Sequence, residues 1–528
     1  MDVISLSADV FRSPLFYSAI IALSAFCAVR YVRVHWRNLP PGPKGISLLC
    51  VLLRLHQEPW KIFKHLGKEH GPLVYLNVLG QPLIVLNSPK VAADLLDRRA
   101  GNYSDRPRNI VAGDLMTGGL FLPFNRYGAL WRRMRKAAHE GLHKGVITRF
   151  LPTQYDEALV LTCGVLSHPQ NWDAHLRRAS ASATMSLVYD TPPIESEDDP
   201  SVKSINDCVA RLTRAAAPGA HFVEIFPWMM YIPDRLASWK RVALDWFDHD
   251  SAIFENLFNA VRDHRVSTSL AAGTDRPSLA ATLIENSQRH GLSELENSWL
   301  SATLYAAGAE TTSGVMAWWM LAMVAYPETQ RRAQAELDAV VGRSRLPKFS
   351  DFRNLPYVRA MVKEALRWQP VDRLGLPHRS TEDDWYDGYF IPAGSIVIAN
   401  VWQINRDPEI YGADADEFNP ARHLNSDGQV APGPADMKEE GHVTYGFGRR
   451  ICIGRHAANN SLFIDIAMML WAMNIEQGVD DQGRPLPFDL NGFVDHGLVV
   501  RPVPFECKIT PRFPEAVSLL QQEKELIS

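Results

Sequence analysis

The segment from Tyr445 to Gly454, YGFGRRICIG, constrains this chain more than any other part of its 528 residues. Glycines at 446 and 448 permit a tight turn in the left-handed region of backbone space and let a flat ligand approach the main chain. Cys452 follows, and apolar residues at helical spacing begin at Leu462. The sequence therefore predicts a cysteine at the start of a buried helix, where the helix dipole is expected to lower the pKa of the thiol. A thiolate in that place would be a strong metal ligand.

This segment resembles the cysteine loop of the haem-thiolate monooxygenases, the cytochrome P-450 family, which reads FxxGxRxCxG. The matching positions are Gly448, Arg450, Cys452 and Gly454. Tyr445 stands where the family usually has phenylalanine, so its hydroxyl adds polarity beside the sulfur. The resemblance implies that Cys452 binds the iron of haem b and that the other four residues line the cofactor. The alternative is a buried structural cysteine after a glycine-rich turn.

Composition limits the classes of function. The net charge of −4 argues against a nucleic-acid partner, which would require a basic surface. The six cysteines are scattered without metal-finger spacing, so neither a disulfide framework nor a zinc site is indicated. A hydrophobic content of 46% is sufficient for a large core, and the length is compatible with one large domain.

The N-terminal region has the pattern of a membrane anchor. Residues 13–29 contain no charged side chain, and arginines at 30, 33 and 37 follow, whereas Arg12 alone precedes. The positive-inside rule then leaves the body of the protein on the cytoplasmic side. A cleaved signal peptide is the alternative. The resemblance implies a single-pass protein of the endoplasmic reticulum membrane with a cytoplasmic catalytic domain.

A proline-rich stretch separates this segment from the rest of the chain. The sequence PPGP at positions 40–43 cannot continue a helix, so a stiff, extended hinge is expected. We therefore predict an anchor over residues 1–36, a hinge over 37–45 and a haem-thiolate monooxygenase domain over 46–528.

The fold class predicted for the body is mainly α with small β-sheets. Residues 72–86 contain two β-branched runs around a glycine, which is typical of a hairpin. Short alternating runs between residues 377 and 399 predict further small strands. The remainder is mostly helical in period. The resemblance implies the cytochrome P-450 fold with an N-terminal transmembrane helix.

Trp131 and Arg135 lie four residues apart on a predicted helix, so they share one face. Residues 102–124 before them read as a long loop, which in a compact domain is usually functional. By resemblance to the family's WxxxR helix, Trp131 and Arg135 contact the haem propionates. His378 or Arg379 could also reach a propionate, and the sequence does not decide between them.

A long helix is predicted from about residue 294 to 325, and AGAETT at 307–312 interrupts it with weak helix formers. We expect Gly308 to open a groove beside the helix, into which Thr311 points its hydroxyl. The segment resembles the family's (A/G)GxxTT motif, in which an acid and a threonine flank bound dioxygen. The resemblance implies that Thr311 and Glu310 relay protons. The alternative is a threonine that caps a helix kink.

Glu364 and Arg367 lie three residues apart on another predicted helix. If the pair is buried it requires a third partner, because two desolvated charges alone seldom satisfy each other. The family joins its ExxR pair to a later arginine, and Arg422 in FNPARH is the matching residue, with Ala421 in place of the usual glutamate. The resemblance implies a structural network beneath the haem.

Residues 222–233, FVEIFPWMMYIP, form an aromatic, proline-bearing loop. An apolar patch of that size marks a membrane or ligand contact if it is exposed, and a core segment if it is buried. In the family the corresponding loop dips into the bilayer and borders the substrate entrance.

Together the motifs resemble a fungal microsomal member of the family. The resemblance implies insertion of one atom of dioxygen into a hydrophobic small molecule, such as a terpenoid of secondary metabolism. Electrons are expected from NADPH through a separate cytochrome P-450 reductase, since no GxGxxG nucleotide motif is found. The alternatives are a non-catalytic haem sensor and a haem-thiolate isomerase or dehydratase.

Overall fold

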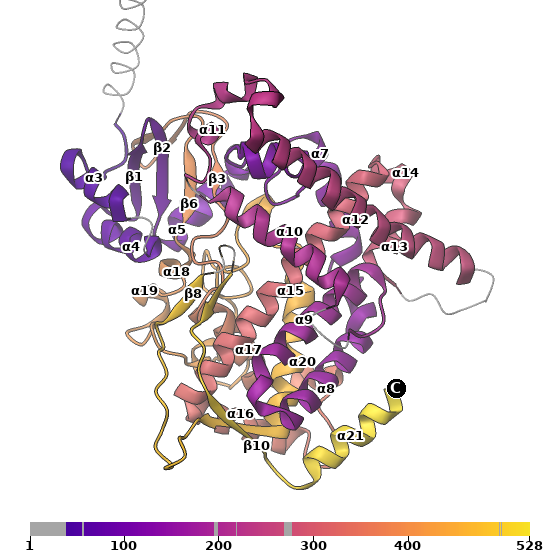
Figure 1. Cartoon of the computed structure of the whole chain (residues 1–528). Helices are drawn as coiled ribbons and strands as arrows, with labels where there is room; N and C mark the ends of the chain where they lie inside the picture. Colours follow the sequence, from indigo (N-terminus) through magenta and orange to yellow (C-terminus); the bar gives the residue numbers. More distant parts are fainter. Residues whose placement is uncertain are drawn as a thin grey trace, which may run out of the picture.

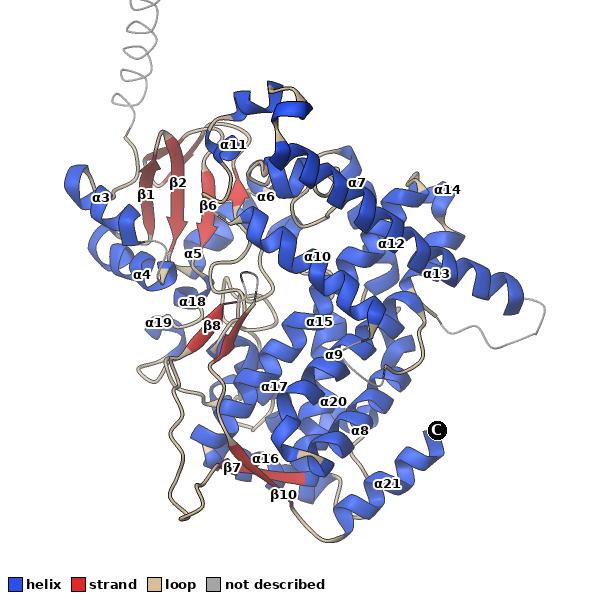
Figure 2. Ribbon diagram, viewed as in Figure 1, coloured by secondary structure: helices blue, strands red, loops and turns tan. Residues whose placement is uncertain are grey.

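The computed structural model describes residues 38–54, 58–194, 199–217, 219–268, 277–495, 497 and 499–527. The predicted membrane anchor over residues 1–36 lies outside these ranges. Within them, no helix combines the length and the apolar character needed to cross a bilayer. Helices dominate the molecule and the small sheets lie toward one side (Figures 1 and 2), as the sequence predicted.

The α-helices of the described ranges are α3 (Gly45–Arg54), α4 (Pro59–His70), α5 (Pro89–Ala92), α6 (Ala100–Tyr103), α7 (Ala129–Leu142), α8 (Leu151–Ser167), α9 (Trp172–Tyr189), α10 (Pro200–Ala216), α11 (Phe222–Ile225), α12 (Ser238–Thr268), α13 (Leu279–Glu285), α14 (Ser287–His290), α15 (Glu294–Ala325), α16 (Pro327–Val340), α17 (Pro356–Trp368), α18 (Val401–Ile404), α19 (Pro408–Tyr411), α20 (Arg455–Ala472) and α21 (Glu515–Ile527). Short 3-10 or π segments are η1 (Ala93–Arg98), η2 (Ile110–Leu115), η3 (Ile147–Phe150), η4 (Pro169–Asn171), η5 (Pro227–Tyr231), η6 (Asp234–Leu236), η7 (Phe349–Asn354), η8 (Pro420–His423) and η9 (Gly448–Arg450).

The strands are β1 (Leu73–Val78), β2 (Gln81–Leu86), β3 (His378–Arg379), β4 (Asp384–Tyr386), β5 (Tyr389–Ile391), β6 (Ile396–Ala399), β7 (Met473–Gln477), β8 (Phe493–Asp495), β9 (Val500–Pro502) and β10 (Cys507–Pro511). The largest sheet has the order β1-β2-β6-β3. The other sheets pair β4 with β5, β8 with β9, and β7 with β10.

The hairpin of β1 and β2 turns at Leu79 and Gly80, whose φ angles of 50° and 89° suit a two-residue turn between twisted antiparallel strands. β6 then pairs with β2 in parallel, with Leu83 opposite Ile396. The expected hinge before the hairpin contains no helix over residues 38–44, and the Tyr75 backbone N–H donates to the Pro41 carbonyl at 2.9 Å. Residues distant in the sequence thereby form one layer beside the helices.

Helix α15 runs through the middle of the helical part (Figure 1) and packs against α9, α12 and α20. Its start is fixed by a capping box, in which the Ser293 hydroxyl accepts from the Glu296 backbone N–H and the Glu296 carboxylate accepts from that of Ser293. Because α15 is apolar on most of its surface, it is buried along most of its length. Its observed bounds agree with the helix predicted over residues 294–325.

Candidate active site

The cysteine loop connects η9 to the start of α20, and its backbone requires glycine. Gly446 and Gly448 have φ angles of 73° and 53°, in the region that favours glycine. A Cβ atom at Gly448 would lie 2.1 Å from the Leu96 carbonyl oxygen, so this glycine lets the loop pack directly on η1. The Cys452 backbone N–H donates to the Tyr445 carbonyl at 2.8 Å and closes the loop.

Cys452 is exposed, yet protein surrounds it closely enough that burial raises the pKa of its thiol. The sequence analysis expected a lowered pKa, and the net shift has the opposite direction. The N–H groups of Gly454 and Arg455 and the charge of Arg135 do act in the expected direction. Burial outweighs them because an anion loses its hydration there. A bound metal cation would supply the missing charge and deprotonate the thiol.

The residues on either side of the sulfur differ in what they contact. The Tyr445 hydroxyl donates to Asn459 Oδ1 on α20 at 2.7 Å, so the group that departs from the family pattern is already paired. On the other side, a Cβ atom at Gly454 would meet no heavy atom within 4 Å. Ile453 packs in the same apolar cluster as Trp131 of α7 and Ala306 of α15. The loop is therefore held between these two helices.

Three arginines gather beside the loop, and we call Arg106, Arg135 and Arg450 the arginine cluster. Arg450 donates through Nε to the Ser104 carbonyl at 2.8 Å and through Nη2 to the Asn125 carbonyl at 2.7 Å. Its guanidinium lies 4.2 Å from the centre of the Trp131 ring, within cation–π range.

The other two members also bond to backbone carbonyls. Arg135 donates to the Ile451 carbonyl, next to the cysteine. Arg106 donates through Nη1 to the carbonyls of Leu376 and Pro377, at 2.6 and 2.8 Å. The acceptors of these hydrogen bonds are neutral carbonyls, and the nearby carboxylates of Asp372 and Asp105 compensate the positive charge of the cluster only in part.

Burial lowers the pKa of all three arginines, to about 10 for Arg106 and Arg135 and to about 8 for Arg450. For Arg450 the repulsion from Arg106 and Arg135 adds to the effect of burial. Such shifts mark a place where positive charge exceeds the counter-charge beside it. An anionic group bound there would be strongly stabilised.

The structure distinguishes the two candidates at positions 378 and 379. His378 is buried, its Nδ1 lies 2.7 Å from the Tyr103 carbonyl, and the charges of Arg106 and Arg450 act on it. Burial lowers the pKa of His378 well below its usual value, so it is neutral. Arg379 instead bonds to Asp105 at 3.2 Å and lies outside the cluster.

Arg106 was not predicted from the sequence. It lies in the aperiodic stretch after α6, which was singled out only as a long loop. The nearest signal was the expectation that such a loop is functional. Arg106 Nε donates to the nearby Pro123 carbonyl, but its partners Leu376 and Pro377 are some 270 residues away in the chain, so only the fold reveals them.

The side chains of Thr311 and Glu310, both on helix α15, contact different partners. The Thr311 hydroxyl donates to the Ala307 carbonyl at 2.8 Å, and Ala307 is exposed although it lies midway along a mostly buried helix. Glu310 Oε2 lies 3.6 Å from Nη1 of Arg177 on α9. The expected role of Gly308 is wrong: a Cβ atom there would lie 2.8 Å from Thr184 Cγ2 of α9. The glycine permits close packing of two helices and does not open a groove.

Glu364, Arg367 and His423 are buried, and together with Arg422, whose side chain is 7% exposed, they form a set that we call the Glu364 network. Arg367 makes two hydrogen bonds of 2.7 Å to the Glu364 carboxylate, and Arg422 Nε donates to it at 3.1 Å. His423 Nε2 lies 2.9 Å from the same carboxylate, a contact that the sequence analysis missed. Burial opposes the charge of Glu364, but Arg367 and His423 hold its pKa far below the usual range.

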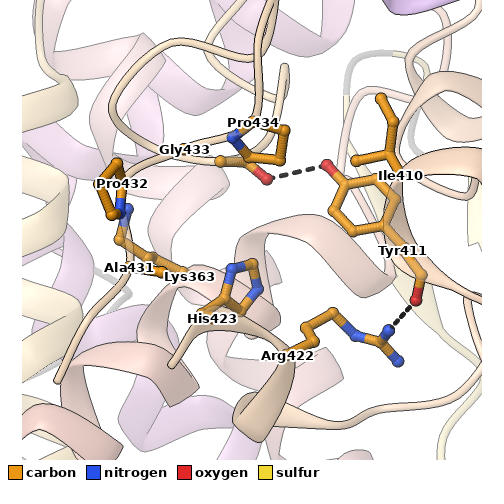
Figure 3. Close-up of a pocket in the computed structure, with 10 residues that line it drawn as sticks. Lys363, Ile410, Tyr411, Arg422, His423, Ala431, Pro432, Gly433 and Pro434 are labelled. Carbon is orange, nitrogen blue, oxygen red and sulfur yellow. Dashed lines mark hydrogen bonds between the residues drawn. The ribbon is translucent and has the colours of Figure 1, made fainter. Parts of the chain in front are cut away.

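A cavity of about 90 Å³ borders this network (Figure 3), with Lys363, Tyr411, Arg422 and His423 in its walls. Its polar walls are already bonded: the Tyr411 hydroxyl donates to the Gly441 carbonyl at 2.8 Å, and Lys363 Nζ donates to the Glu439 carbonyl at 2.6 Å. A small polar space of this kind suits ordered water and not an organic substrate.

Comparisons with known proteins agree with this arrangement. The family model for cytochrome P450 matches residues 40–509. A cytochrome P450 monooxygenase of Armillaria gallica is 66% identical over 515 residues, which cover 98% of each chain. One from Postia placenta is 48% identical over 483 residues, covering 92% of this chain and 90% of the relative. A solved zebrafish cytochrome P450 shares the fold, with a TM-score of 0.67 and 23% identity over 86% of this chain and 100% of that one. The chain therefore belongs to the cytochrome P450 family of monooxygenases.

Proposed function

We propose that Cys452 binds the iron of haem b and that the protein inserts one atom of dioxygen into a hydrophobic small molecule, by hydroxylation or epoxidation. The observation that carries this proposal is the convergence of an exposed cysteine and of the arginine cluster, with its excess positive charge, beside one loop. Bound haem supplies the activation of oxygen, which a protein side chain cannot perform.

The residues fit this cofactor in three respects. The Cys452 sulfur has free surface for a metal bond. The arginine cluster offers buried positive charge for the two carboxylates of a haem, and Trp131 packs against Arg450. Neutral His378 donates its Nδ1–H to the Tyr103 carbonyl, so its Nε2 is an acceptor, and we propose that it packs beside the cofactor without donating to a carboxylate. The open side of Gly454 gives a flat ring close access to the backbone, while Tyr445 and Gly448 shape the loop.

We assign Thr311 and Glu310 to proton transfer on the substrate side of α15. Thr311 can exchange its bond to the Ala307 carbonyl for one to a substrate or water, since a hydroxyl both donates and accepts. Glu310 can accept and return a proton through ordered water. The Glu364 network has a structural role, as its charges are satisfied within the protein.

The proposed setting is the endoplasmic reticulum membrane, with a single N-terminal span and a cytoplasmic catalytic domain. The aromatic loop supports membrane contact: Phe222, Trp228 and Tyr231 are 72%, 63% and 89% exposed. We propose NADPH–cytochrome P450 reductase as the electron donor. Exposed Arg449 beside the cysteine loop could contribute positive charge to that docking face.

For the substrate we propose a hydrophobic secondary metabolite, such as a terpenoid. Support comes from the fungal origin of the relatives and the large apolar cluster that joins α15 to the loops around η2 and η5. This class fits a site with few polar side chains.

The test is turnover of a panel of terpenes and aromatics by membranes that contain the protein and a reductase, under isotopically labelled dioxygen. The expected result is an NADPH-dependent product that carries one labelled oxygen atom. A product formed without NADPH, or without label, would indicate an isomerase or dehydratase. Thr311→Ala is expected to consume NADPH with little product, and unchanged coupling would remove Thr311 from the mechanism.

A further inference from the structure

Asp173, near the start of α9, holds one arginine with each of its carboxylate oxygens. Nε of Arg177 donates to Asp173 Oδ2 at 3.0 Å, and Nη2 of Arg501, on β9, donates to Oδ1. Both arginines then reach α15: Arg177 Nη1 lies 3.6 Å from Glu310 Oε2, and Arg501 Nη1 donates to Ser313 Oγ at 3.0 Å. Ser313 lies 3.1 Å from the Glu310 carbonyl and donates to it. These five residues form a closed loop of contacts, which we call the Asp173 ring.

The distances within the ring show which carboxylate holds Arg177. The bond from Arg177 to Asp173 has hydrogen-bond length, whereas the contact from Arg177 to Glu310 is too long for a charge-assisted hydrogen bond, which measures about 2.7–2.9 Å. The side chains of Arg177 and Glu310 are 29% and 30% exposed, so water weakens their attraction further. Asp173 therefore outcompetes Glu310 for the arginine.

The other half of the ring fixes Asp173 itself. Arg501 is almost fully buried, and burial lowers the pKa of its guanidinium, although Asp173 opposes that shift. Burial also works against the charge of Asp173, but Arg501 and Arg177 together hold the pKa of Asp173 below its usual value. Asp173 is thus an anion at neutral pH and is bonded to Arg501 of strand β9.

We propose that Asp173 is a positioning residue for Glu310: by drawing Arg177 toward itself, it keeps the Glu310 carboxylate free to turn and to carry protons. This inference rests on the proposed proton role of Glu310. Without Asp173, Arg177 would close on Glu310 as a direct ion pair. A carboxylate that is bound in such a pair must break it before it can take up or release a proton at another position.

The experiment compares Asp173→Ala, Arg177→Gln and the double variant in the haem-loaded, full-length protein with reductase, NADPH and 7-ethoxycoumarin as the probe. The readout is hydrogen peroxide released per NADPH oxidised. We expect Asp173→Ala to raise this ratio several-fold and Arg177→Gln to leave it near the original value. The double variant should return to the original value, because Arg177, the arginine that lies within ion-pair distance of Glu310, is then absent. Equal uncoupling in the single and double variants, or no effect of Asp173→Ala, would overturn the proposal.

A second measurement is independent of turnover. Double-mutant cycles of Glu310→Gln and Arg177→Gln on thermal unfolding should show no coupling in the original protein and a stabilising coupling in the Asp173→Ala background. Absence of coupling in both backgrounds would contradict the proposed capture.

Asp480→Asn is the matched control, since Asp480 is also paired with an arginine four residues on, at 2.7 Å, but in the turn after β7. It should change neither readout. All variants should keep the carbon monoxide spectrum of thiolate-bound haem. Loss of that spectrum in the unmodified protein would refute the proposed function and would leave the contacts of the ring unaffected.

Discussion

Two buried groups of charge, the Glu364 network and the arginine cluster, are built on opposite principles. In the Glu364 network one carboxylate receives two arginines and a histidine, and every contact lies between 2.7 and 3.1 Å. In the arginine cluster three guanidinium groups are bonded to neutral carbonyls and repel one another. The first is electrically complete within the protein, whereas the second becomes complete only with an anionic partner.

The difference indicates what each group does. A complete buried network stabilises one arrangement of α17 and η8, and loses its value when one member is removed. An incomplete cluster destabilises the ligand-free protein, and the binding of an anionic ligand removes that destabilisation. A substitution in the Glu364 network should therefore destabilise the haem-free protein, whereas a substitution in the arginine cluster should not.

The largest effect is expected for Glu364→Ala. This change leaves Arg367 buried without its counter-charge, which costs about 3–5 kcal/mol and should prevent stable incorporation of haem. Haem content per protein and the free energy of unfolding measure it. Glu328→Ala, which removes an exposed ion pair with Arg331, should cost less than about 1 kcal/mol. Normal haem content in Glu364→Ala would contradict the structural role.

Arg450→Leu should act in the opposite direction on the haem-free protein. The change removes a buried charge and its repulsion from Arg106 and Arg135, so the Tm of the haem-free form should not fall. The loaded protein should lose haem to an acceptor apoprotein about 10–100 times faster, because a partner of the cofactor is gone. Arg449→Gln, at the exposed neighbour, should retain haem normally. A lower Tm of the haem-free Arg450→Leu variant, together with an unchanged rate of haem loss, would contradict the proposed difference between the arginine cluster and the Glu364 network.

The smallest effect is expected for Trp131→Phe. It keeps an apolar ring in the core but weakens the cation–π contact with Arg450, worth about 0.5–1 kcal/mol. Chemical denaturation of the loaded protein measures the change, and Trp385→Phe, at an exposed position, serves as the control. A loss of several kcal/mol would mean that Trp131 acts through packing and not through the guanidinium.

Much of this arrangement could be predicted from the sequence because the signals are local. The helix over 294–325 follows from its helical sequence pattern, and the turn before Cys452 follows from its glycines. The identity of the family follows from the spacing of the cysteine loop, and the family model agrees over residues 40–509.

Other features depend on contacts that no local pattern encodes. Gly308 was expected to open a groove beside the helix, but Thr184 of another helix packs against it. The pKa of Cys452 was expected to be lowered by the helix terminus, yet burial by the assembled fold raises it. Arg106 has no motif at all, and only the packing of its loop against residues 376 and 377 brings it to the cluster.

The central claim is that the sulfur of Cys452 is the iron ligand. The most direct test is the absorption spectrum of the purified, reduced protein under carbon monoxide, compared with those of Cys452→Ser and Cys507→Ser. We predict the red-shifted Soret band of thiolate coordination in the original protein and in Cys507→Ser, and its loss in Cys452→Ser. A haem-loaded original protein without that band, or a Cys452→Ser variant that keeps it, would contradict the account.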